Sequence, residues 1–170
     1  MMQTLIVLRG APASGKTTIA KQLRDFDNKV VWFKTDNLKE FFDNPSDDRA
    51  LDEVFKTCYA VLENLLDRGY TVVYEGIFKK SEYANNAIEI AKKRNIKYFV
   101  YQLDCSIETL IKRDKERSDQ TNGIRPPMDR NVIESLLNKV INNPIENAIF
   151  LNTEEDALEE CINEIKKNIQ

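Results

Sequence analysis

Residues Gly10-Ala11-Pro12-Ala13-Ser14-Gly15-Lys16-Thr17 decide how this chain folds. They follow the apolar run Leu5 to Leu8 directly, and a helix is expected over Lys16 to Leu23. Two glycines with four residues between them, then Lys and Thr, form the P-loop pattern, here between a strand and a helix. In that geometry successive backbone N–H groups and the positive helix end face one anion. The pattern predicts a nucleotide phosphate site, and the alternative is a tight turn of small residues.

The motif also predicts roles for individual side chains. The Lys16 ammonium should reach the β- and γ-phosphates, and the Thr17 hydroxyl should coordinate Mg²⁺. We expect ATP to contact the whole loop and the first turn of the helix, namely Gly10, Ala11, Pro12, Ala13, Ser14, Gly15, Lys16, Thr17 and Thr18.

Length and composition limit the possible classes of protein. A chain of 170 residues fits one domain, 1–170, and the formal net charge of -3 offers no general attraction to polyanions. Cys58, Cys105 and Cys161 each lie in an apolar pattern, which indicates packed thiols and no disulfide or zinc framework. The sequence has no histidine, which excludes His-dependent nucleophiles and His-ligated metals. The apolar run near Met1 is too short for a signal peptide or membrane span, so we expect a cytoplasmic protein.

Two later strands are each followed by an acidic residue. A strand over 29–34 precedes Asp36, and a strand over 70–74 precedes Glu75. Residues just beyond the carboxyl ends of parallel strands line the ligand crevice, where the P-loop also lies. We therefore predict Asp36 as a catalytic carboxylate and Glu75 as a second Mg²⁺ ligand, direct or through water. The alternatives are an N-cap role for Asp36 and a solvated carboxylate for Glu75.

A basic helix and a polar loop predict a lid. After a fourth strand over 96–103, the next helix carries Arg113 and Arg117 one turn apart and hence on one face. Residues 118–127 have loop chemistry, and a further helix follows Asp129. Such a segment, about 113–128, can exclude water and bring cations to a transferring phosphoryl group. The alternative is a solvated charged face.

Strands alternate with helices to the end of the chain, where a fifth strand over 148–151 precedes a closing helix. This order predicts an α/β fold with a doubly wound parallel sheet.

At this point the sequence resembles the P-loop kinases of the nucleotide and shikimate kinase group, most of all polynucleotide 5′-hydroxyl kinase domains. The resemblance rests on the P-loop, on Thr35-Asp36 with Lys39 after it, and on the run Leu110 to Arg117. It implies a three-layer α/β/α sandwich whose five parallel strands have the order 2-3-1-4-5, with a helical lid.

The family also implies roles for the residues outside the P-loop. The Asp36 carboxylate would accept the proton of the acceptor hydroxyl, and the lid residues Arg113 and Arg117 would hold the donor phosphates. Lys39 would contact the acceptor at a position where arginine is more usual, and lysine lacks the bidentate contacts of arginine. The resemblance thus implies transfer of the γ-phosphate of ATP, with Mg²⁺, to an alcohol, with the 5′-OH of a polynucleotide as first candidate.

Three other functions compete with this one. The nearest is the same chemistry on a small metabolite, antibiotic or nucleotide-sugar hydroxyl, as in gluconate, chloramphenicol or zeta-toxin-type kinases. A nucleotide-driven switch or ATPase is another, although residues 28–31 and 138–141 both lack the Asp of a guanine-binding Asn-Lys-x-Asp motif. A regulatory domain without chemistry is the third. The motifs leave the acceptor and the oligomeric state open.

Overall fold

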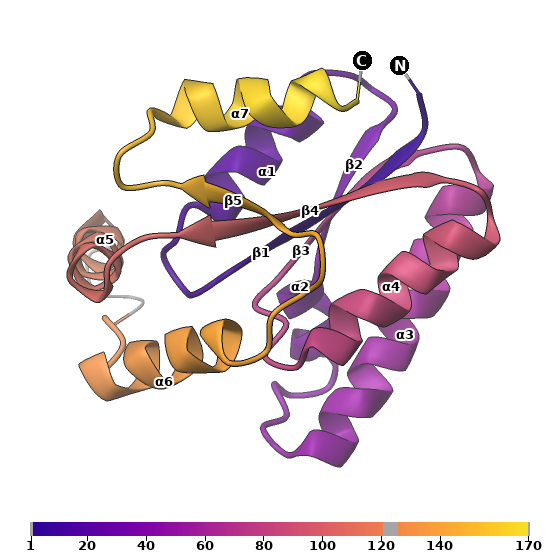
Figure 1. The fold of residues 1–170 in the computed structure, drawn as a ribbon. Helices are drawn as coiled ribbons and strands as arrows, with labels where there is room; N and C mark the ends of the chain where they lie inside the picture. Colours follow the sequence, from indigo (N-terminus) through magenta and orange to yellow (C-terminus); the bar gives the residue numbers. More distant parts are fainter. Residues whose placement is uncertain (1, 121–125, 170) are drawn as a thin grey trace.

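The computed structural model describes residues 2–120 and 126–169 and contains a five-stranded parallel sheet (Figure 1). The strand order is β2-β3-β1-β4-β5, which confirms the predicted order 2-3-1-4-5. The strands are β1 Thr4–Gly10, β2 Val30–Lys34, β3 Thr71–Gly76, β4 Lys97–Asp104 and β5 Ile149–Asn152.

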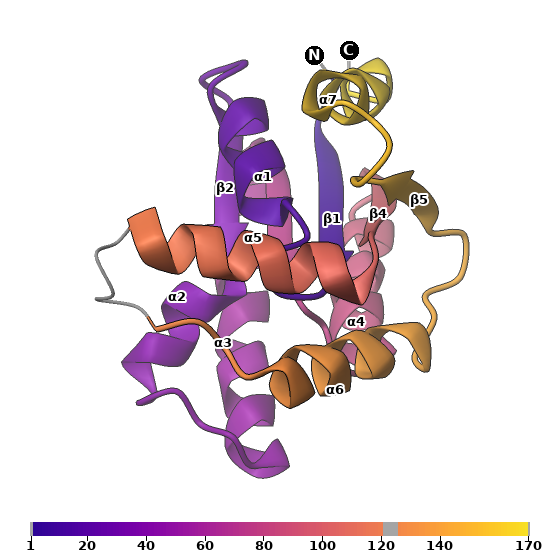
Figure 2. The same ribbon diagram turned by 90° about the vertical axis from the view of Figure 1, so that its left-hand side faces the viewer.

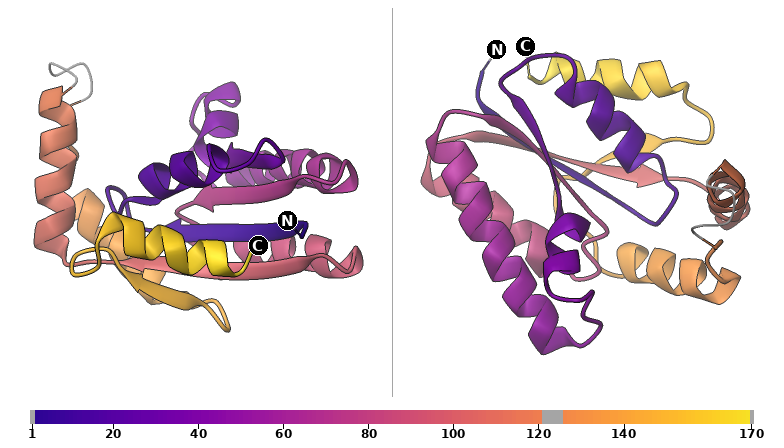
Figure 3. Two further views of the ribbon diagram at one scale, coloured as in Figure 1. Left: turned by 90° about the horizontal axis from the view of Figure 1, so that it is seen from above. Right: turned by 180° about the vertical axis from the view of Figure 1, so that it is seen from behind.

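Helices cover both faces of the sheet and make the predicted three-layer sandwich. One face is covered by α1 and α7, and the other by α3 and α4 (Figure 1). Two more helices, α5 and α6, lie across the carboxyl ends of the strands (Figures 2 and 3). The helices are α1 Lys16–Arg24, α2 Thr35–Phe41, α3 Asp48–Asp67, α4 Ser81–Lys93, α5 Ile107–Gln120, α6 Arg130–Ile141 and α7 Leu158–Lys167.

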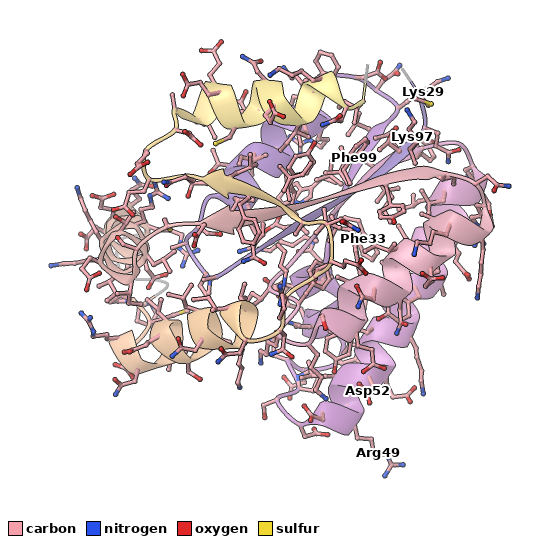
Figure 4. The ribbon with its side chains drawn as sticks, viewed as in Figure 1. Lys29, Phe33, Arg49, Asp52, Lys97 and Phe99 are labelled. Carbon is pink, nitrogen blue, oxygen red and sulfur yellow. The ribbon has the colours of Figure 1, made fainter. Side chains whose placement is uncertain are left out.

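The central strand β1 is buried on both faces, as a parallel sheet between two helical layers requires. Leu5 and Val7 belong to the core under α3 and α4, whereas Ile6 and Leu8 belong to the core under α1 and α7. Aromatic side chains on other strands follow the same division, with Phe33 on the α3 side and Phe99 on the α7 side (Figure 4). The apolar run that precedes the P-loop thus anchors it between two cores.

Asp36 lies inside a helix and not at its N-cap, and Glu75 lies inside a strand and not just beyond its end. Asp36 is inside the first turn of α2, whose N-cap is Lys34, and no side chain caps this helix, so the N-cap prediction for Asp36 is wrong. Glu75 is part of β3 and only 2% exposed, so it is not a solvated carboxylate after the strand. The strand continues through Glu75 because β1 pairs with it as far as Gly76.

The loop predicted over 118–127 begins later than expected. Helix α5 continues to Gln120, so the first part of the predicted loop, from residue 118, is helical. Residues 121–125 of that loop lie outside the described residues. The three cysteines are free, with Cys58 and Cys161 buried and Cys105 half-buried against a small cluster around Leu110. No helix in the described ranges is long and apolar enough to cross a membrane.

Candidate active site

The loop between β1 and α1 depends on both of its glycines. Gly15, the N-cap residue of α1, has φ 97°, a backbone conformation that glycine adopts without strain. A Cβ on Gly10 would lie 2.9 Å from the Leu103 carbonyl oxygen in β4, closer than real contacts allow. The glycines therefore let the loop turn tightly against the sheet and present the first backbone N–H groups of α1.

Lys16 is buried inside this loop. Its Nζ donates hydrogen bonds to the carbonyl oxygens of Gly10 at 2.9 Å and Ala11 at 2.7 Å. Burial lowers the pKa of Lys16 to about 8, although the nearby Glu75 and Asp36 carboxylates raise it in part. Within the described chain Lys16 forms no ion pair. An ammonium bonded only to neutral oxygens is suited to binding an anionic phosphate.

Glu75 and Thr17 meet at the carboxyl end of β3. The Thr17 hydroxyl donates a hydrogen bond of 2.8 Å to Glu75 Oε1, and the Trp32 indole N–H donates one of 2.7 Å to Oε2. Carboxylate and hydroxyl oxygens are the ligands that Mg²⁺ prefers. No group of three potential metal-ligating side chains occurs among the described residues. The pair therefore fits Mg²⁺ held through few protein ligands, waters and phosphate oxygens, which is its usual environment in kinases.

Asp36 forms ion pairs with two lysines that are close to it in the sequence. Lys39 Nζ is 3.1 Å from Oδ1, and Lys34 Nζ is 3.8 Å from Oδ2. Burial raises the pKa of Asp36, but the hydrogen bond and charge of Lys39 and the charges of Lys34 and Lys16 outweigh it, so the net pKa is lowered. The side chain is 44% exposed. Asp36 is thus an ionised carboxylate that a ligand can reach.

Arg113 and Arg117 of α5 have different partners. Arg113 donates to the carbonyl oxygen of Thr153 at 2.5 Å and to its hydroxyl at 3.2 Å. Arg117 forms a short ion pair with Asp114, one turn before it. Asp114 is 3% exposed and also accepts a hydrogen bond of 2.7 Å from the Met128 backbone N–H.

These elements surround one cleft of about 830 Å³ at the carboxyl ends of the strands. This volume is in the range of small-molecule and cofactor sites. The cleft is lined by most of the predicted P-loop residues, Pro12 to Thr18, and by Asp36, Glu75, Arg113 and Arg117. Lys39 is not among the described lining residues, but its ammonium forms an ion pair with Asp36, which does line the cleft.

Sequence reasoning missed Asp114, Thr153 and Trp32. A signal for Asp114 was present, because it follows Leu110 by four residues and therefore lies on the buried face of α5. Thr153 follows the last strand directly, at the same edge of the sheet as the other site residues. Trp32 had no signal of its own, since a tryptophan inside a strand is most often a core residue.

Comparison with known proteins adds a family and a fold. The family model described as "Zeta toxin" matches residues 2–168. Among solved structures, the chain is similar to one in the Pnkp1/Rnl/Hen1 RNA repair complex, with 20% identity, a TM-score of 0.68 and 84% of this chain covered. That match spans 45% of the other chain.

Two further structures match over most of both chains. A gluconokinase from Sinorhizobium meliloti 1021 is 18% identical, with a TM-score of 0.71, over 96% of this chain and 89% of that one. The Mycobacterium tuberculosis APS kinase CysC, in complex with AMPPNP and APS, is 15% identical, with a TM-score of 0.68, over 98% and 96%. At these identities the likeness shows the fold, which is that of P-loop kinases.

Proposed function

The chain belongs to the zeta toxin family and has the fold of P-loop kinases, and from this we propose that it transfers the γ-phosphoryl group of ATP to an alcohol. One observation carries the proposal: the ionised, accessible Asp36 carboxylate faces the same cleft as Lys16 and Thr17 of the P-loop. A regulatory domain that only binds a nucleotide needs the P-loop alone. A kinase also needs a group that orients and deprotonates an acceptor hydroxyl.

The donor side of the proposed site is the P-loop. Backbone N–H groups at the start of α1 would bind the phosphates, and Lys16 would exchange its two carbonyl partners for phosphate oxygens. Thr17 and Glu75 would hold Mg²⁺, which neutralises charge on the β- and γ-phosphates when bound.

The acceptor side is proposed around Asp36. Its carboxylate would accept the hydroxyl proton as the new P–O bond forms, and Lys39 and Lys34 keep it ionised for that purpose. Arg113 and Arg117 would stabilise the charge that spreads over the transferring group, as proposed for a lid over 113–128. Arg117 would then leave Asp114 for the phosphate chain.

The surroundings of Asp36 favour an acceptor that carries an anionic group. Lys79 is half-buried, and burial and the charges of Lys39 and Lys139 lower its pKa, although the charges of Asp48 and Asp36 raise it in part. These lysines come from separate elements, and Lys39 forms an ion pair with Asp36. A polynucleotide 5′-OH, which has a phosphate on its 3′ side, fits this charge and remains the first candidate. A small phosphorylated or nucleotide-linked alcohol fits it too, and membership of the zeta toxin family favours that alternative.

The test is incubation of the protein with γ-labelled ATP, Mg²⁺ and a panel of acceptors: 5′-OH oligonucleotides, nucleosides, sugars and nucleotide sugars. We expect label on one acceptor class, and none with Lys16→Ala. Label on 5′-OH oligonucleotides would select the polynucleotide acceptor, and label only on a sugar or nucleotide sugar would select the alternative. Release of labelled phosphate alone, equal with and without every acceptor, would contradict the kinase proposal.

A further inference from the structure

Glu75 has an uncommon environment for a carboxylate. It is 2% exposed, and its two oxygens accept hydrogen bonds from two neutral donors, the Thr17 hydroxyl and the Trp32 indole N–H. Within the described chain, no lysine or arginine forms an ion pair with it. The charge of Lys16 interacts with Glu75 without forming an ion pair, so a divalent cation would supply the direct positive partner that this buried carboxylate lacks among the described residues.

We propose that Trp32 is a positioning residue for this metal site: its indole N–H fixes Glu75 Oε2, so that Oε1 faces Thr17 and the metal. The inference rests on the proposed donor site and adds a residue to it. Outer partners of metal-ligating carboxylates commonly act in this way, and their loss typically weakens metal binding by about 10- to 100-fold.

The sheet register explains how Trp32 reaches this carboxylate. Trp32 pairs with Val73 and Lys34 pairs with Glu75, so Trp32 is the diagonal neighbour of Glu75 on the same face of β2 and β3. Lys34, directly opposite Glu75, has its ammonium 3.8 Å from Asp36 and forms no ion pair with Glu75. The second oxygen of Glu75 is thereby left to the indole.

Trp32 is itself held in place. Its ring packs against the core under α1 and α7, and the Arg24 guanidinium lies over it at 5.8 Å from the ring centroid. A ring fixed on both sides presents its N–H in one direction. Without that N–H, Oε2 would be buried and unsatisfied, and the carboxylate would turn to recover a partner.

Trp32→Phe tests the proposal because it keeps an aromatic ring and removes the N–H. Calorimetry would measure the affinity for a non-hydrolysable ATP analogue with Mg²⁺ and with EDTA. We expect the gain in affinity that Mg²⁺ gives to fall about 10-fold or more in the variant, while the affinity in EDTA stays near that of the wild type.

Tyr101→Phe is the matched control, since it also removes one polar group from a buried aromatic residue of the sheet. The Tyr101 hydroxyl accepts a hydrogen bond of 2.7 Å from Asn168, just beyond α7. This variant should keep the full gain in affinity for the ATP analogue that Mg²⁺ gives. If Mg²⁺ raised the affinity for the ATP analogue equally in Trp32→Phe, Tyr101→Phe and the wild type, the proposal would be overturned. Trp32 would then be only a core residue.

Fluorescence gives a second test that needs no change to Trp32, which is the only tryptophan of the chain. Adding Mg²⁺ to the complex with the ATP analogue should change indole emission in the wild type and leave it unchanged in Glu75→Gln. If calorimetry showed that Mg²⁺ binds to the wild type but the indole emission did not change, the inference would be contradicted. If Mg²⁺ did not raise the affinity of the wild type for the ATP analogue, the proposed donor site would be contradicted instead.

Discussion

Lys16 has a pKa of about 8 because it is buried, and this makes nucleotide binding depend on pH. A phosphate that binds the ammonium favours the charged form and raises its pKa. Above about pH 8 the free protein has lost this proton, so binding must take one up and the affinity must fall as pH rises.

Calorimetry in buffers of different ionisation enthalpy measures this proton uptake. We expect close to one proton per Mg·ATP analogue bound at about pH 9, and a much smaller fraction at about pH 7. The measurement at pH 7 is the internal control. No proton uptake at pH 9, with unchanged affinity, would show that Lys16 does not contact the phosphates in the way proposed.

Asp36→Asn should separate chemistry from binding. The amide keeps the size of the side chain and loses the negative charge that accepts the hydroxyl proton, so kcat should fall by about 10²-fold or more with ATP affinity near that of the wild type. Because the pKa of Asp36 is lowered, the wild type should lose kcat/KM on acidification only below the range of an ordinary aspartate. An unchanged kcat in Asp36→Asn would exclude a role as base.

Single residues differ in how far the sequence could predict them. Lys16, Thr17, Asp36 and Glu75 could be placed near one cleft, because a motif and the ends of parallel strands locate them. Trp32 could not, since its contact with Glu75 depends on the register of two strands about forty residues apart and on one side-chain rotamer. Their roles in binding and chemistry stay predictions.

Helix α5 presents both lid arginines to the cleft. If both bind the phosphate chain, each contact should matter most in the transition state, where charge spreads over the transferring group. Single Ala substitutions of Arg113 and Arg117 should lower kcat/KM by at least about 10-fold. The double variant should lose less than the two losses combined, because the residues act as a unit. Unchanged kcat/KM in all three variants would indicate that Arg113 and Arg117 belong to a solvated charged face of α5.

Asp114 joins the two sides of the predicted lid. Its carboxylate binds Arg117 on α5 and the Met128 N–H on the chain leading to α6. Asp114→Ala should lower the free energy of unfolding by about 1–3 kcal/mol, because it leaves a backbone donor unpaired. Urea denaturation measures the change, and Asp119→Ala, an exposed acid on the same helix, is the control. Equal free energies of unfolding for Asp114→Ala and Asp119→Ala would show that the contacts of Asp114 with Arg117 and the Met128 N–H do not stabilise the fold.

The helices and strands were predicted well in type and less well at their ends. Short apolar, β-rich runs predicted every strand of the described sheet, but β3 extends through Glu75 and α5 extends to Gln120. The extension of β3 depends on a tertiary partner, because β1 pairs with β3 as far as Gly76. Local sequence patterns carry no information on such partners.

The whole sheet brings the proposed donor and acceptor sides together. With the order β2-β3-β1-β4-β5, the segment with Asp36 and the P-loop emerge at one edge, separated only by β3 with Glu75. The parallel doubly wound sheet could be predicted from the alternation of strands and helices, and the resemblance to P-loop kinases implied its strand order. The acceptor could not be predicted, because the lysines that we propose for its recognition come from α2, α6 and the loop before α4, which no motif links.

The central claim is that the cleft moves a phosphoryl group from ATP to an alcohol and not to water. The most direct measurement follows γ-labelled ATP with the acceptor selected from the panel and counts phosphorylated acceptor and free phosphate for each ATP consumed. We predict one phosphorylated acceptor per ATP, little free phosphate, and ATP consumption that depends on the acceptor. Consumption at the same rate without acceptor, with all label released as phosphate, would contradict the claim and make the protein an ATPase.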